Sequence, residues 1–146
     1  MPHLPTDEIR FAVEVRNGRW IKSELLDLLR VHNVALVLNC YYTMPDIAAL
    51  RQQIDPLSAD FLYLRFLGDR KKMDEYVEQM IQQGRKQRHW DALVWDRQQE
   101  LRHWAKHTKE LSETRENMPV FAFFNNHYAG YAPGSLGIFA RAWQEQ

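Results

Sequence analysis

The sequence predicts an α/β fold in which parallel strands alternate with helices. Residues 120–124 form an unbroken apolar run, which is typical of a strand covered on both faces, as in parallel sheets. A strand pattern at 11–17, a helix pattern at 20–33 and a second strand pattern at 34–40 follow one another within about thirty residues. That succession indicates a right-handed parallel crossover unit.

Length and charge limit the class of protein. The chain has 146 residues and a 45% hydrophobic fraction, so we expect a single domain over 1–146. Lysine plus arginine equals aspartate plus glutamate at 19 each, which leaves no overall field to attract nucleic acid or an anionic membrane. No apolar stretch approaches the roughly 18 residues of a membrane span, and the first residues lack the apolar core of a signal peptide. We therefore expect a cytoplasmic protein without nucleic-acid or membrane partners.

The single cysteine, Cys40, excludes an intrachain disulfide and a thiolate zinc cluster. It lies at the end of the predicted strand 34–40, where a small buried side chain is the usual interpretation and a nucleophile the alternative. Tyr41 and Tyr42 follow in a loop, before a short helix predicted over 46–54. The two tyrosines either form the wall of a pocket or shield the end of the sheet.

Two predicted strands direct arginines to the same side. In 11–17, Glu14 and Arg16 share a face opposite the valines, and in the third predicted strand, 59–68, Tyr63 and Arg65 alternate with leucines. Arg16 and Arg65 both lie near the carboxyl end of a strand, where parallel sheets bind ligands. This pattern indicates a positively charged floor for a carboxylate or phosphate, with a structural arginine–glutamate cluster as the alternative.

In the second half, the spacing of apolar residues predicts helices over 73–81 and 90–115, with a basic solvent-exposed turn at 84–89 between them. The final strand, 120–124, delivers Asn125, Asn126 and His127 to its carboxyl end, and a helix begins near Pro133. His127 is the one histidine at a strand end and is the candidate general base. The i, i+4 pair at 103 and 107 is interpreted as a surface pair rather than a metal site.

Several segments together resemble the YecE-like family of proteins of unknown function, the DUF72 type of TIM barrel. The resemblance lies in residues 11–20, 34–39, 59–71, 90–97 and 121–133. It implies an eight-strand β/α barrel of about twice this length, of which this chain corresponds to the carboxyl-terminal half with the last four strands. It also implies site roles for Glu14, Arg16, Trp20, Arg65, Asn125, Asn126, His127, Gly130 and Pro133. Cys40 departs from the family, whose members tend to have an aspartate there, and so does the Pro-Gly-Ser at 133–135.

From these observations we predict a site at the carboxyl ends of the strands. Glu14 and His127 are the candidate catalytic residues, and no metal site is predicted, while any cofactor is left open. The candidate ligand-binding residues are Arg16, Trp20, Asn39, Tyr63, Arg65, Asn125 and Asn126.

The predicted function is binding of, or action on, a small anionic ligand, a phosphate or carbohydrate, at this edge of the sheet. The alternative is a non-catalytic interaction module, or a truncated half-barrel that needs a partner half. A half-barrel would have two unpaired edge strands and an exposed inner face, which need to be covered. The sequence leaves three arrangements open: a homodimer of two halves, a separate amino-terminal half, and a monomer with an open twisted sheet.

Overall fold

The computed structural model describes residues 8–85 and 91–146, and these form a four-stranded parallel sheet with helices. The strand order is β1-β2-β3-β4, and each neighbouring pair runs parallel, which confirms the predicted α/β fold. The elements are β1 (Phe11–Val13), the 3-10 turn η1 (Gly18–Trp20), α1 (Ser23–Val31), β2 (Val34–Tyr41), α2 (Ile47–Gln53), β3 (Leu62–Gly68), α3 (Arg70–Gln82), α4 (Gln98–Ser112), β4 (Val120–Tyr128) and α5 (Ala132–Gln144).

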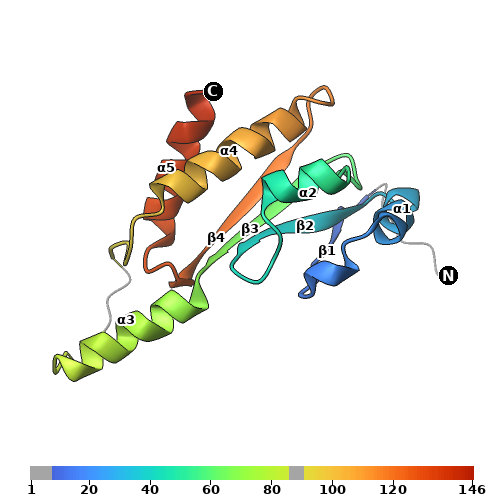
Figure 1. Ribbon diagram of the computed structural model, residues 1–146. Helices are drawn as coiled ribbons and strands as arrows, with labels where there is room; N and C mark the ends of the chain where they lie inside the picture. Colours follow the sequence, from blue (N-terminus) through green and yellow to red (C-terminus); the bar gives the residue numbers. More distant parts are fainter. Residues whose placement is uncertain (1–7, 86–90) are drawn as a thin grey trace.

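One face of the sheet carries the hydrophobic core. Figure 1 shows α2, α4 and α5 on the same side of the strands. At the centre of this face the Phe66 ring stacks on Phe124, with ring centroids 4.4 Å apart, and also contacts Phe139 and Trp104. Phe66 is completely buried. The apolar stripes of α4 and α5 are therefore stabilised by packing on alternate residues of β2, β3 and β4.

In the described part of the chain, no helix covers the opposite face. Phe121 and Phe123 of β4 lie on this helix-free face and are 36% and 50% exposed. The prediction that residues 120–124 form a strand covered on both faces is therefore wrong within residues 8–85 and 91–146. The run is apolar on both faces, but the packed helices supply a cover for only one of them.

Some predicted boundaries also need correction. β1 ends at Val13 rather than at residue 17, because the chain then turns away from β2 into η1. β4 continues to Tyr128, so residues 125–127, expected at the carboxyl end of a strand over 120–124, belong to the strand itself. The helix expected over 90–115 begins at Gln98, where Asp96 accepts a hydrogen bond from the amide of Gln98. Most of the predicted basic turn, residues 86–89, lies outside the described residues.

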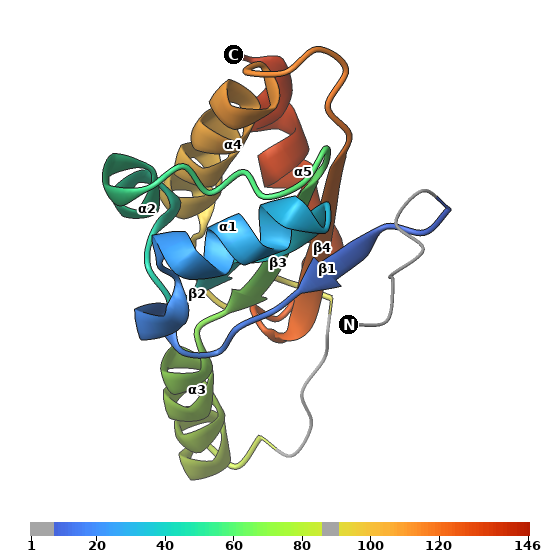
Figure 2. The same cartoon turned by 90° about the vertical axis from the view of Figure 1, so that its right-hand side faces the viewer.

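Helix α3 differs from the others because it projects beyond the end of β3 (Figure 2). Of its apolar residues only Met73 is buried, and Ile81 is 67% exposed. Gly68 makes the turn into α3 with φ +87°, and a Cβ at this position would lie 2.2 Å from the carbonyl oxygen of Tyr128. Glycine is therefore required where β3 closely approaches the end of β4.

Within 8–85 and 91–146, no helix has both the length and the apolar character needed to cross a bilayer.

Candidate functional site

The centre of the predicted site is a carboxylate between two arginines. Glu14 forms an ion pair with Arg65 of β3 and a second one with Arg16, whose Nε lies 2.7 Å from the Glu14 Oε1. The Arg16 contact is a close ion pair without hydrogen-bond alignment, whereas Arg65 donates a hydrogen bond. The Glu14 side chain is 18% exposed and that of Arg16 is 62% exposed. The structure thus brings these three predicted residues together. Their net charge is +1, because the Glu14 carboxylate neutralises one of the two arginines.

Glu14 and Arg65 line a depression of about 640 Å³ on the helix-free face of the sheet, and Tyr63 lines it too. Glu8 and Glu14 balance Arg10 and Arg65 in its wall, so the depression itself carries no excess positive charge. Its remaining lining residues are Ile9, Ala12, Val37, Phe61 and Phe121.

Asn39 is in register with Arg65 but has a different environment. It is 4% exposed, and within the described residues neither its Oδ1 nor its Nδ2 has a hydrogen-bond partner. A buried amide without partners costs about 1–3 kcal/mol per unsatisfied group. Asn39 therefore destabilises the fold unless a ligand or water completes its hydrogen bonds.

A second cavity, of about 260 Å³, lies at the carboxyl ends of β2 and β3. Tyr41 and Tyr42 form part of its wall, with ring centroids 4.6 Å apart, and Asn39 also lines it. Four carboxylates and two cationic groups line it, an excess of two negative charges, which favours a neutral or cationic ligand over a phosphate. The charged lining residues are Asp46, Asp69, Asp96, Glu100, Lys72 and Arg97.

Arg97 is the residue of this cavity that sequence reasoning missed. Its side chain is 1% exposed. It donates to Glu100 at 2.8 Å, to the Ser135 hydroxyl at 3.4 Å and to the Cys40 sulfur at 3.8 Å. The sequence signal for it is its position directly after Asp96, which accepts a hydrogen bond from the Gln98 amide at the start of α4. Arg97 ties the start of α4 to β2 and α5.

The environment of Cys40 favours the neutral thiol. Burial raises the pKa of Cys40 well above its ordinary value, and the nearby Glu100 carboxylate raises it further. The sulfur lies 3.3 Å from the Glu100 Oε1, to which the thiol donates. This favours the structural interpretation over the nucleophilic one.

The polar residues of β4 have local partners. The Asn125 Oδ1 accepts a hydrogen bond from the His127 amide, and the Asn126 Oδ1 accepts one from the Ala132 amide, both at 2.6 Å. These bonds shape the connection from β4 into α5. The His127 ring lies against Tyr128, with centroids 4.7 Å apart. Neither asparagine nor His127 lines the two cavities described above.

Trp20 also lies outside both cavities. It ends the η1 turn and is 65% exposed. The structure therefore divides the predicted residues into the Glu14–Arg16–Arg65 cluster with Tyr63, the buried Asn39, the turn-forming residues of β4, and Trp20.

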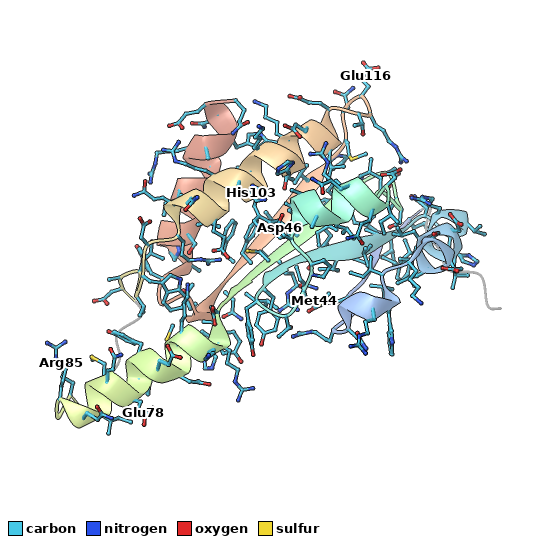
Figure 3. The ribbon with its side chains drawn as sticks, in the orientation of Figure 1. Met44, Asp46, Glu78, Arg85, His103 and Glu116 are labelled. Carbon is cyan, nitrogen blue, oxygen red and sulfur yellow. The ribbon has the colours of Figure 1, made fainter. Side chains whose placement is uncertain are left out.

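The histidines of α4 form a polar contact with α2. The His103 Nε2 lies 2.9 Å from Asp46, the residue that caps α2, and Figure 3 shows the two side chains facing each other. His107 contacts Arg51 and Glu110. Burial lowers the pKa of His107, and the neighbouring His103 lowers it further. Within the described ranges, no group of three His, Cys, Asp or Glu residues is placed to hold a metal ion.

The sequence matches a family model, "Protein of unknown function DUF72", over residues 1–146. The chain belongs to the DUF72 family. No curated protein matches it. The fold is similar to that of a DUF72 protein from Thermotoga maritima MSB8, with TM-score 0.63 and 23% identity, covering 93% of this chain and 46% of that one. A DUF72 protein from Enterococcus faecalis V583 is similar with TM-score 0.60 and 16% identity, covering 94% and 48%.

This DUF72 chain therefore spans about half the length of these two solved structures. The similarity at these identities concerns the fold. It agrees with the four parallel strands and one-sided helices described above, which are those of a partial barrel.

Proposed function

We propose that this DUF72 chain acts as one half of a β/α barrel, and that a second four-strand half covers its helix-free face. The observation that carries the proposal is the exposure of Phe121 and Phe123 on the helix-free face of a parallel sheet, in its outer strand β4. Parallel sheets occur almost only with both faces covered, and large exposed apolar patches mark interaction sites.

The topology supports the same proposal. The strands lie in sequence order, and the connecting helices pack on one face, which is the winding of a closed barrel rather than of a doubly wound open sheet. β1 and β4 are the outer strands, so each has one edge unpaired within the described sheet. A second unit of four strands would pair with both edges and complete the eight strands of a barrel. The chain's coverage of 46% and 48% of the two solved structures is consistent with this count.

The test measures whether Phe123 becomes covered. A Phe123→Cys variant is labelled with a thiol reagent, alone at increasing concentration and when fused to the part of the Thermotoga maritima protein that this chain does not match. Cys40 gives little background because it is buried and its pKa is raised. Leu136→Cys is the matched control, because Leu136 is 49% exposed on α5.

We expect the cysteine at 123 to be protected in at least one of these states, and the cysteine at 136 to remain reactive in all of them. Equal and rapid labelling at both positions in every state would contradict the half-barrel function.

A second candidate function is binding of a small anion at the Glu14–Arg16–Arg65 cluster. It is favoured by the convergence of two arginines on one point near the carboxyl end of the sheet. Glu14 already occupies that point, so an anionic ligand competes with its carboxylate. Glu14→Gln should therefore strengthen anion binding, and Arg65→Ala should abolish it.

Calorimetric titration with inorganic phosphate, sulfate and a sugar phosphate tests this candidate. Arg141→Ala is the control, because Arg141 is an exposed arginine on α5, away from the cluster. Equal heats for the wild type, Glu14→Gln and Arg65→Ala would exclude the cluster as an anion site.

A further inference from the structure

We infer that the Glu14–Arg16–Arg65 cluster binds a 2-hydroxy carboxylate, and that Asn39 is the residue that selects the hydroxyl group of this ligand. The inference rests on the second candidate function, anion binding at the cluster, and names the class of anion. It comes from the position of the Asn39 side chain beside Arg65 and from the hydrogen bonds that its amide lacks.

Asn39 points to the same face of the sheet as the cluster. Its neighbours along β2, Leu38 and Cys40, belong to the core that the helices cover. Successive side chains of a strand point to opposite faces, so the Asn39 side chain lies on the helix-free face. In the β2–β3 register its partner is Arg65, and neighbouring strands are about 4.8 Å apart. The two side chains therefore lie side by side.

The contact between Glu14 and Arg65 crosses β2 on this face. Glu14 directly follows β1, Arg65 is on β3, and β2 lies between these two strands. Continued by one residue, the β1–β2 register places Glu14 level with Val37, and Asn39 is the next β2 residue on the same face. An anion that replaces the Glu14 carboxylate on Arg65 therefore lies over β2, on the face to which Asn39 points.

The cluster can open to such an anion without a change in the sheet. The side chains of Arg16 and Arg65 are 62% and 32% exposed. Glu14 lies in the irregular segment 14–17 between β1 and η1, so its carboxylate is not fixed by a strand. Rotation of these side chains is enough to release Arg65 and give a ligand access to the neighbouring amide.

The Asn39 amide is buried without hydrogen bonds. It is 4% exposed, and in the described part of the chain neither its Oδ1 nor its Nδ2 has a partner, although buried polar side chains are nearly always hydrogen-bonded. The Thr108 hydroxyl on α4 also lacks one, but a threonine in a helix can turn its hydroxyl to the carbonyl one turn back. Backbone groups of a strand point along the sheet, so the Asn39 side chain has no such local partner.

The two ends of the amide need different partners. Nδ2 donates a hydrogen bond and Oδ1 accepts one, whereas a simple carboxylate or sulfate offers acceptor oxygens alone. A 2-hydroxy carboxylate supplies both, because a carboxylate oxygen accepts from Nδ2 and the hydroxyl donates to Oδ1. Its carboxylate also matches the guanidinium fork of Arg65. The pairing of Arg65 with Asn39 in the register therefore suits an anion that carries a hydroxyl on the adjacent carbon.

Calorimetric titration with glycolate and propionate tests this inference. The two anions have the same charge and the same number of non-hydrogen atoms, and they differ by a hydroxyl in place of a methyl group. The titrations use the wild type and Glu14→Gln, which removes the competing carboxylate. We expect glycolate to bind about ten-fold more tightly than propionate, because it alone satisfies both ends of the buried amide.

Asn39→Leu, combined with Glu14→Gln, should reduce the affinity for glycolate to that for propionate, without weakening propionate. Urea unfolding shows that this variant is folded, and the loss of an unpaired amide should not destabilise it. Thr108→Val is the matched control, because it removes another buried polar atom without a partner, on α4. It should leave both affinities unchanged.

The outcomes separate this inference from the function on which it rests. Equal affinities for glycolate and propionate would overturn the role of Asn39 and leave anion binding at the cluster standing. A preference for glycolate that persists in Asn39→Leu, or that Thr108→Val also removes, would have the same meaning. Binding of neither anion would overturn both proposals.

Discussion

The two faces of the sheet are built from the same strands but have different environments. In β3, Leu64 and Phe66 point to the helices and are completely buried. Tyr63 and Arg65, which alternate with them along the strand, point to the helix-free face and are partly exposed. Both faces are rich in apolar side chains. The comparison shows that apolar character alone does not determine burial, because burial also needs a partner element on the same side.

Charged side chains also have different environments on the two faces. On the helix side, Arg97 is buried and connects three elements through its contacts with Glu100, Ser135 and Cys40. On the helix-free face, Arg16 and Arg65 share one carboxylate and remain partly exposed. The predictions that follow probe this contrast between the faces, and the first has the largest expected effect.

Phe66→Ala should lower the free energy of unfolding by about 3–5 kcal/mol, because it leaves a cavity among Phe124, Phe139 and Trp104. Phe123→Ala on the other face should cost about 1 kcal/mol or less, because that ring is half exposed. Urea unfolding of both variants measures the difference. Equal losses would mean that the helix-free face is already covered in the isolated chain.

Arg97→Ala should lower the free energy of unfolding by about 2–3 kcal/mol, since it removes the buried guanidinium that donates to the Ser135 hydroxyl and to the Cys40 sulfur. Arg102→Ala is the matched control. Arg102 of the same helix pairs with Glu145, and both side chains are about half exposed, so its loss should cost clearly less. Thermal or urea unfolding compares them, and equal losses for the two variants would show that the buried contacts of Arg97 stabilise the fold no more than a surface ion pair does.

Asn39→Leu should raise the free energy of unfolding by about 1 kcal/mol, because it replaces an amide without partners by an apolar side chain of similar volume. Urea unfolding in the absence of ligands measures the gain. Asn126→Leu is the comparison and should destabilise, because its Oδ1 accepts a hydrogen bond from the Ala132 amide. A loss for Asn39→Leu would show that the amide has a partner in solution.

The smallest expected effect is a dependence of stability on pH from the contact between α2 and α4. The folded-state pKa of His107 is lowered by burial and by His103, so the unfolded chain takes up that proton first and stability falls as the pH falls through about 6.5. Burial is the largest single influence on the pKa of Asp46 and raises it, but the hydrogen bonds from His103 and the Ala48 amide, together with the charge of His103, outweigh it, so the net shift is downward. The stability that Asp46 contributes is therefore lost only below about pH 4.

Unfolding free energies measured between pH 8 and pH 3 should thus decline in two separate ranges. His107→Gln should remove the decline near neutral pH and leave the acidic one unchanged. A neutral-range decline that persists in this variant would assign it to another histidine.

Much of the architecture followed from local patterns. Alternation in 62–66 and helical spacing in 98–112 are local consequences of strand and helix geometry, and the structure has a strand and a helix there. The convergence of Glu14 with Arg65 was also accessible, because parity places both side chains on one face of the sheet, Glu14 directly after β1 and Arg65 on β3, with β2 between them. The burial of Arg97 was not accessible, because it depends on contacts with residues 57 and 38 positions away in the sequence.

The sequence by itself determined the strands and helices, the parallel direction of the strands and the presence of apolar residues on both faces of the sheet. These features depend on short-range periodicity and chain connectivity. Only the tertiary structure decided which of the two apolar faces is covered, since that depends on where whole helices pack. The same physical reason explains why Phe124 is part of the core while Phe123, its neighbour in the chain, remains half exposed.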